Sequence, residues 1–151
     1  MTAATTQATQ VYPIFIKASP QAIWDAITKP EFSARYFYGA RIENTPTHHT
    51  ALGPDGSDWG TSEMLEFDPP RRLAYAWRST WDPAAVSEPA SRVIWEIGSA
   101  EPQDSGYTLL TLTHDRLEHS PKTAASVAGA GWMLVLSGLK TLLETGAPLA
   151  A

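Results

Sequence analysis

His114 is the residue of this sequence best placed to do chemistry. It lies at the end of an alternating stretch, on the same face as Leu110 and Leu112. On that face it could orient a polar head group of a ligand or act as a general base. The alternative is a structural histidine bonded to the backbone or to its neighbour Asp115, and the sequence alone favours this alternative.

The other reactive groups do not combine into a catalytic or metal site. His48 and His49 are adjacent, so on a strand they face opposite ways and cannot bind one metal ion, and we expect a solvent-exposed pair. Glu63 and Glu66 are three residues apart, which places them on opposite faces and does not support a paired-carboxylate site. The absence of cysteine excludes thiolate catalysis and cysteine-based zinc sites. We predict no catalytic residue, no metal and no cofactor.

Large aromatic residues, including six tryptophans, are the remaining candidates for a site. A buried indole supplies a large apolar area, and its N–H needs a hydrogen-bond partner. Tyr75 and Trp77 share a face of one expected strand, Trp95 lies on another, and Trp132 lies on an expected helix. A packed core and a pocket wall both remain open for these four. The predicted ligand-binding residues are Phe37, Leu65, Phe67, Tyr75, Trp77, Trp95, Leu112, His114, Trp132 and Leu136.

Turn and capping signals divide the chain into a strand, two short helices, six strands and a long helix. Ser19 and Pro20 are a typical helix start, because serine caps the helix and proline presets its first backbone angle. Pro30 ends that helix. The predicted strands span 11–17, 38–44, 47–52, 61–68, 73–79, 92–98 and 107–115, and the second short helix spans 31–36.

The C-terminal segment predicts a long helix with an apolar stripe. Ser120 and Pro121 repeat the capping signal, and Gly146 ends the helix. Gly129 and Gly131 indicate a close approach of another backbone, room for a ligand, or a break between two helical pieces. The stripe consists of Trp132, Val135, Leu136, Leu139, Leu142 and Leu143.

This order predicts an α+β domain in which a curved antiparallel sheet of six or seven strands wraps around the long helix. One helix fills such a concave face incompletely, so we expect a cavity between the sheet and the C-terminal helix. The expected division is a flexible tail over 1–10, a single domain over 11–146 and a C-terminal tail over 147–151.

Several strings resemble the START-like (SRPBCC) superfamily, and in particular its branch named after the activator of the heat-shock protein 90 ATPase, in a stand-alone bacterial form. They lie at 18–31 and 66–73, with shorter matches at 91–93, 110–114 and 131–132. The resemblance implies a helix-grip fold with a cavity between the sheet and the long helix, and it implies no particular reaction. The segment from Trp81 to Ala90 departs from the pattern and is expected to be a long loop that could cover the cavity mouth.

Charge and hydropathy limit the possible partners. A net charge of -5 disfavours binding to nucleic acid. The longest uncharged apolar stretch, 127–139, is too short for a membrane span. The first ten residues lack the basic and apolar regions of a secretory signal, so we expect a cytoplasmic protein, monomeric or homodimeric.

The sequence therefore favours the binding of a hydrophobic or aromatic small molecule, lipid-like or polyketide-like, in the cavity. One alternative is a cavity-based enzyme of the cyclase or hydrolase type that uses His114. Another is a co-chaperone-like module for protein interaction. Whether any reaction is catalysed stays open, with binding alone favoured.

Overall fold

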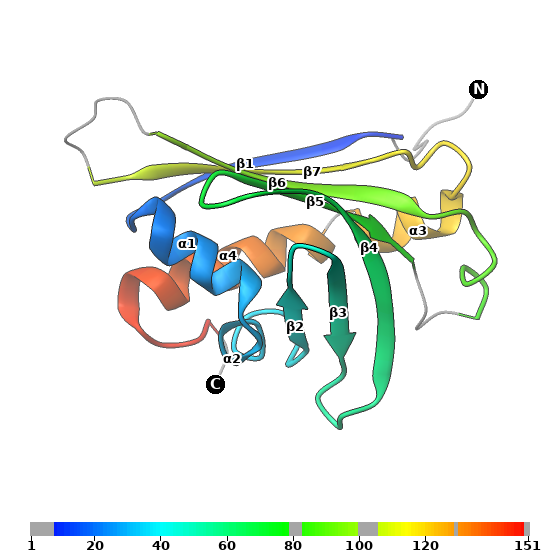
Figure 1. The fold of residues 1–151 in the computed structure, drawn as a ribbon, viewed down its shortest axis with the longest axis horizontal. Helices are drawn as coiled ribbons and strands as arrows, with labels where there is room; N and C mark the ends of the chain where they lie inside the picture. The colour runs from blue at the N-terminus through cyan, green and yellow to red at the C-terminus, as the bar shows by residue number, and fades with distance from the viewer. Residues whose placement is uncertain (1–7, 79–82, 100–105, 129, 150–151) are drawn as a thin grey trace.

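The computed structural model describes residues 8–78, 83–99, 106–128 and 130–149. It confirms the α+β class and the order of elements expected from the sequence (Figure 1). The elements are β1 (Gln10–Ile16), α1 (Pro20–Thr28), α2 (Pro30–Ser33), β2 (Arg41–Asn44), β3 (His48–Leu52), β4 (Asp58–Asp68), β5 (Arg72–Trp77), β6 (Ser91–Ser99), β7 (Thr108–Asp115), α3 (Pro121–Val127) and α4 (Ala130–Thr145).

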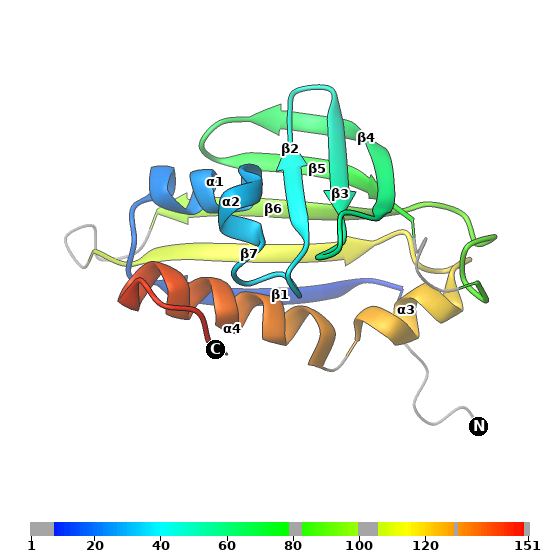
Figure 2. The same cartoon turned by 90° about the horizontal axis from the view of Figure 1, so that it is seen from below.

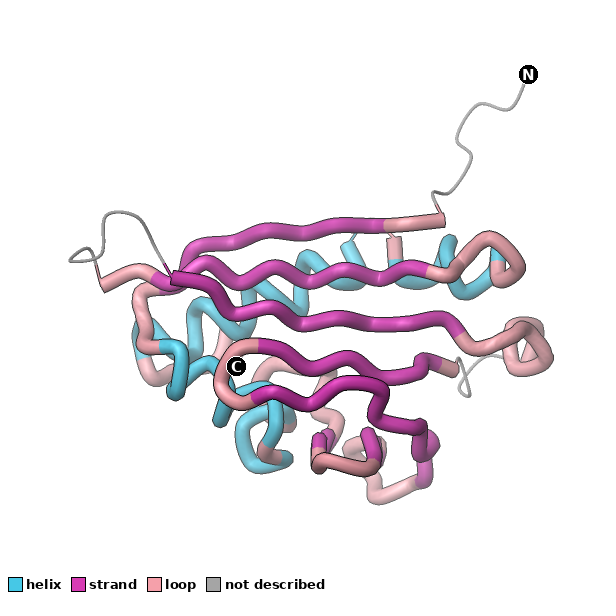
Figure 3. The backbone as a smooth tube through the Cα atoms, turned by 45° about the horizontal axis from the view of Figure 1, so that its top comes forward, coloured by secondary structure: helices cyan, strands magenta, loops and turns pink. Residues whose placement is uncertain are grey.

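The seven strands form one antiparallel sheet in the order β1-β7-β6-β5-β4-β3-β2. The sheet curls, so that β2 and β3 turn back beside the helices (Figures 1 and 2). All helices lie on the concave side, and the opposite side of the central strands has no helix over it (Figure 3). This is the helix-grip arrangement that the resemblance implied.

Local sequence explains where the first helix begins and ends. The Ser19 hydroxyl accepts a hydrogen bond from the Ala22 backbone N–H at 3.1 Å, and Pro20 occupies the first turn. Lys29 is extended ahead of Pro30, which ends the helix. The predicted cap and stop are therefore confirmed.

Two strands differ from the prediction because of local backbone geometry. Strand β2 begins at Arg41 rather than at residue 38, since Tyr38 and Gly39 have left-handed backbone angles, with φ of 55° and 77°. Strand β4 begins earlier than predicted, at Asp58, and contains a bulge at Leu65 between the pairs Met64–Tyr75 and Glu66–Ala74.

The C-terminal segment consists of two helices, so the break left open by its glycines is present. Ala128 follows α3 in an extended conformation, with φ −70° and ψ 173°, and α4 begins at Ala130. By length and composition, residues 121–145 would qualify as a membrane span. In the fold, this segment contributes to the core. Its buried residues in α4 include Trp132, Val135, Leu136, Leu139 and Leu142.

The start of α3 is capped differently from the prediction. The Ser120 hydroxyl makes no capping bond and donates instead to the Pro89 carbonyl at 2.8 Å. The Glu88 carboxylate caps the helix instead, because it accepts hydrogen bonds from the backbone N–H groups of Lys122 and Thr123, each at 2.9 Å. The loop at 83–90 thus holds α3. Residues 81–82 of the predicted loop lie outside the described residues.

Gly138 lets α4 approach the chain segment that follows α2. A Cβ atom at this position would lie 3.2 Å from the Tyr36 Cβ atom and 3.3 Å from the Tyr36 carbonyl oxygen. Tyr36 is itself fixed, because its hydroxyl donates to the Ala26 carbonyl at 2.8 Å. The contact therefore has little room for a side chain on the helix.

We expect Gly138→Leu to destabilise the fold by about 1–3 kcal/mol, because the clash with Tyr36 outweighs the better helix propensity of leucine. Urea denaturation would measure the change. Ser137→Leu, on the exposed side of the same helix, is the control and should shift stability by no more than about 0.5 kcal/mol. Equal effects of the two substitutions would contradict the close approach.

A candidate ligand cavity

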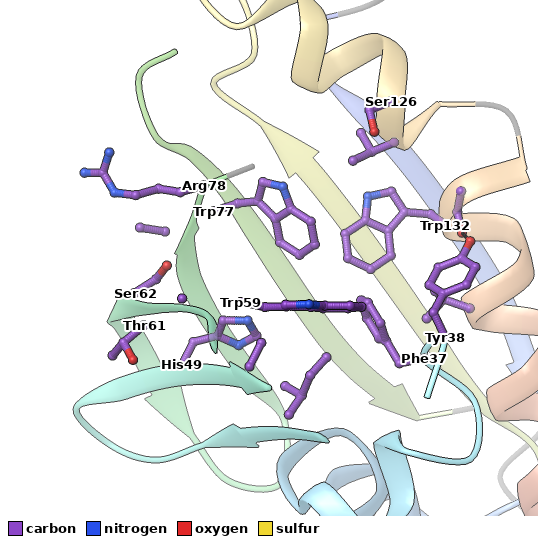
Figure 4. Close-up of a pocket in the computed structure, with 17 residues that line it drawn as sticks. Phe37, Tyr38, His49, Trp59, Thr61, Ser62, Trp77, Arg78, Ser126 and Trp132 are labelled. Carbon is purple, nitrogen blue, oxygen red and sulfur yellow. Dashed lines mark hydrogen bonds between the residues drawn. The ribbon is translucent and has the colours of Figure 1, made fainter. Parts of the chain in front are cut away.

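A cavity of about 370 Å³ lies where the curled part of the sheet meets the junction of α3 and α4 (Figure 4). Strands β2, β3, β4 and the end of β5 form one side, and the two helices form the other. The lining consists of Phe37, Tyr38, Ile42, His49, Ala51, Trp59, Gly60, Thr61, Ser62, Ala76, Trp77, Arg78, Ser126, Val127, Gly131, Trp132 and Val135.

Trp132 is the centre of the aromatic wall. Its ring centroid lies 5.7 Å from that of Phe37 and 5.3 Å from that of Trp77. Behind it, Trp95 packs at 6.1 Å, nearly perpendicular to the Trp132 ring. Edge-to-face contacts of this kind stabilise aromatic clusters beyond the area that they bury. The wall is therefore a fixed surface made by Trp132 of α4, Trp77 of β5 and Phe37, with Trp95 of β6 packed behind it.

A chain of hydrogen bonds holds this wall in place. The Trp132 Nε1–H group donates to His114 Nδ1 at 3.1 Å, and His114 Nε2 lies 2.7 Å from the Ser91 hydroxyl. An indole N–H can only donate, so Nδ1 must carry the lone pair and Nε2 the proton. Burial lowers the pKa of His114 to about 3, which keeps the ring neutral.

In this tautomer His114 cannot act as a general base toward Ser91. A base that activates the Ser91 hydroxyl would have to accept its proton at Nε2, whereas here Nε2–H donates to the hydroxyl. His114 is also fully buried and lies behind Trp132 rather than in the cavity lining. The geometry fits a structural histidine. Its partners are Ser91 and Trp132 rather than the backbone or Asp115.

His49 is buried, which corrects the prediction of a solvent-exposed histidine pair. Its ring stacks on Tyr75 at 3.7 Å with an interplanar angle of 7°, and its Nδ1 lies 2.6 Å from the Asn44 side-chain oxygen. Burial lowers the pKa of His49 to about 3. His48 faces the other way and is exposed, as the alternation of a strand requires.

The predicted ligand-binding residues fall into three groups. Phe37, Trp77 and Trp132 line the cavity. Five others are buried in the core and do not line it, namely Tyr75, Trp95, Leu112, His114 and Leu136. Leu65 is half exposed because the bulge displaces it from the inner face, and Phe67 packs against Trp24, with ring centroids 5.1 Å apart.

The sequence analysis missed Tyr38, His49 and Trp59 as lining residues. A Cβ atom on Gly53 would lie 2.5 Å from Trp59 Nε1, so the glycine of the β3–β4 turn makes room for this indole. The pairing of that glycine with a tryptophan six residues later was the available signal. Nothing in the sequence distinguished the buried His49 from the exposed His48.

The cavity has a few polar groups at its border. They come from Thr61 and Ser62 on β4, Arg78 after β5 and Ser126 on α3. Within the described residues, no group of three His, Asp or Glu side chains lies close enough to hold a metal ion. Apolar walls with few polar groups are typical of small-molecule sites.

Comparison with known proteins identifies the family. Residues 17–144 match the family described as activator of Hsp90 ATPase homolog 1-like protein. The chain belongs to this family. No curated protein matches the sequence.

Several solved structures share this fold. The Aha1 dimer from Colwellia psychrerythraea has a TM-score of 0.70 and 18% identity, covering 93% of this chain and 98% of that one. DynU16, from the dynemicin biosynthetic locus, has a TM-score of 0.70 and 21% identity, covering 94% and 49%. CalU16 from Micromonospora echinospora has a TM-score of 0.67 and 22% identity, covering 94% and 77%. At these identities the likeness establishes the fold alone.

The two buried histidines should make this family member sensitive to mild acid. Their pKa values lie below the ordinary 6.5, so between pH 6.5 and about 3 the unfolded chain binds more protons than the folded one. Acidification in that window therefore lowers the free energy of unfolding, by up to about 1.4 kcal/mol per pH unit for each histidine. Above pH 6.5 the histidines are neutral in both the folded and the unfolded chain, so they lower the free energy of unfolding no further.

Urea denaturation between pH 7.5 and 4.5 would measure this slope. We expect His49→Phe and His114→Phe each to flatten it, whatever their effect on stability at neutral pH. His48→Gln removes the exposed neighbour on the same strand and is the control, with the wild-type slope expected. A slope that both phenylalanine variants retain would contradict neutral buried histidines.

Proposed function

We propose that this protein binds a hydrophobic or aromatic small molecule in the cavity between the curled sheet and the α3–α4 junction. The observation that carries the proposal is the cavity itself, whose volume of about 370 Å³ lies within the range of small-molecule sites. Its walls are mostly apolar, and large aromatic side chains contribute much of them.

The aromatic side chains offer surfaces for a flat ligand. Phe37, Trp59 and Trp77 reach the cavity from three separate segments of the chain (Figure 4). Hydrogen bonds and ring contacts fix the wall around Trp132 in advance, so little conformational freedom would be lost on binding. Pre-formed walls of this kind support the binding of a compact aromatic molecule.

Tyr38 marks one border of the site. Its hydroxyl donates to the Gly131 carbonyl at 2.8 Å, which links the turn before β2 to the first turn of α4. The side chain is half exposed and also lines the cavity. A ligand in the cavity would therefore lie against both its ring and the backbone to which it is bonded.

One structural neighbour is consistent with a small-molecule role. DynU16 shares the fold and belongs to the dynemicin biosynthetic locus. The activation of a chaperone ATPase, to which the family description refers, stays a property of the proteins so named. The proposal extends to a cytoplasmic protein that acts as a monomer or homodimer.

Binding without catalysis is the form of the proposal that the histidines support. An enzyme that used His114 would need its imidazole to accept a proton from a group in the cavity. His114 instead donates through Nε2 to Ser91, and Trp132 occupies its other nitrogen. The residue therefore does not support the alternative of a cavity enzyme.

A substitution that fills the cavity should abolish binding of an aromatic probe. Ala51 lines the cavity, on the same face of β3 as His49, so Ala51→Phe would occupy ligand space. We expect N-phenyl-1-naphthylamine, a neutral fluorescent probe, to bind the wild type and to bind Ala51→Phe at least about tenfold more weakly.

Thr50→Phe is the matched control, because the preceding residue of the same strand points to the other face. It should bind the probe like the wild type in the same fluorescence titration. No saturable binding by the wild type, or equal weakening by both substitutions, would contradict the proposal.

A further inference from the structure

His49 uses one of its two ring nitrogens in the described part of the structure. Its Nδ1 is bonded to Asn44, and within the described parts of the chain Nε2 takes part in no hydrogen bond. The residue is only 6% exposed, and its side chain lines the cavity (Figure 4). Because the residue lines the cavity, this nitrogen is available to a hydrogen-bond donor on a bound ligand.

The orientation of Asn44 decides which nitrogen of His49 carries the proton. The Asn44 Nδ2 group donates to the Ile27 carbonyl at 2.7 Å, so its oxygen is the atom that faces His49. That oxygen can only accept a hydrogen bond, and His49 Nδ1 must therefore be the donor. A neutral imidazole has one N–H, so Nε2 carries the lone pair.

The ring of His49 cannot easily turn away from this arrangement. One face stacks on Tyr75 at 3.7 Å, and Asn44 holds the ring edge at 2.6 Å. Tyr75 is fixed in turn, because its hydroxyl accepts the Trp95 Nε1–H at 3.1 Å. The lone pair on Nε2 is thus held in a fixed direction by three elements, β2, β3 and β5.

We propose that the ligand of this cavity is an aromatic molecule with a neutral hydrogen-bond donor, such as a phenolic or enolic hydroxyl, which it places against His49 Nε2. This inference rests on the proposed function and names the ligand class for the same site. An apolar molecule without a donor would cover the lone pair and leave it unpaired, which makes such a molecule a poorer ligand.

His49 acts here as an acceptor and not as a base. Burial lowers its pKa to about 3, so it holds a hydrogen bond at neutral pH without taking the proton. The selection is therefore between donors and non-donors of similar shape. Ligand anions that lack a donor, such as phenolates, would also be disfavoured because two lone pairs would face each other.

A matched pair of probes tests this selection. We expect wild-type protein to bind 2-naphthol about 3- to 10-fold more tightly than 2-methoxynaphthalene, measured by calorimetry. In His49→Phe, which keeps a ring against Tyr75 but has no acceptor, the ratio of the two affinities should fall to about one. The ratio within one protein cancels any general effect of the substitution on the cavity.

A second measurement needs no substitution. In protein with ¹⁵N-labelled histidine, the free protein should show His49 protonated at Nδ1 only, and 2-naphthol should move the Nε2 resonance toward the position of a hydrogen-bonded nitrogen. The methyl ether should leave that resonance in place. This readout holds even if His49→Phe fails to fold.

The outcomes separate the two proposals. Equal wild-type affinities for both probes, or an unchanged ratio in His49→Phe, would overturn the role of His49 and leave the binding function intact. Binding of neither probe would overturn the binding function, and this inference would fail with it. A His49 protonated at Nε2 in the free protein would contradict the acceptor on which the inference depends.

Discussion

A chain of three side chains, Trp132, His114 and Ser91, connects α4 to strands β7 and β6 through two hydrogen bonds. Each group in the chain is buried, so breaking either bond would leave a polar atom unpaired away from water. The position of Trp132 follows from this chain. The Trp132 indole in turn sets where Phe37 and Trp77 can pack, and with them the wall of the cavity.

Hydrogen bonds and ring stacking also hold the other side of the cavity in place. His49 is held by Asn44 and Tyr75, and Asn44 is held by the backbone of α1 through the Ile27 carbonyl. The cavity is therefore supported by two imidazoles in opposite tautomers, His49 in its lining and His114 behind Trp132. In His114 both ring nitrogens are hydrogen-bonded within the protein, whereas in His49 Nε2 is available to a ligand. Burial keeps both rings neutral, so the difference between them is purely one of hydrogen-bond direction.

Much of the fold could be predicted from sequence because its signals are local. The caps at Ser19 and Pro20 and the period-two strands gave the correct order of elements. Of the ten predicted ligand-binding residues, the three that line the cavity are aromatic. The other seven do not line this cavity. Which residues line it depends on how far the sheet curls, and a sequence does not show that.

The errors in detail have identifiable physical causes. The bulge at Leu65 shifts the alternation of β4 by one residue, and such an irregularity leaves no signal in a hydrophobic pattern. His49 looked like its neighbour because its burial depends on Asn44 and Tyr75, which lie on other strands. The capping of α3 by Glu88 depends on a loop contact from more than thirty residues away.

That loop contact has a consequence for how the cavity can change over evolution. The wall formed by Ser126 and Val127 belongs to α3, which Glu88 and Ser120 attach to the loop at 83–90, whereas the stripe that stabilises the core belongs to α4. Substitutions in the loop can thus shift one side of the cavity through α3 without replacing a residue of the α4 stripe. The opposite side has no such freedom, because Trp132 and Val135 of α4 line the cavity and also belong to the buried core. A substitution there changes the shape of the cavity and the stability of the fold together.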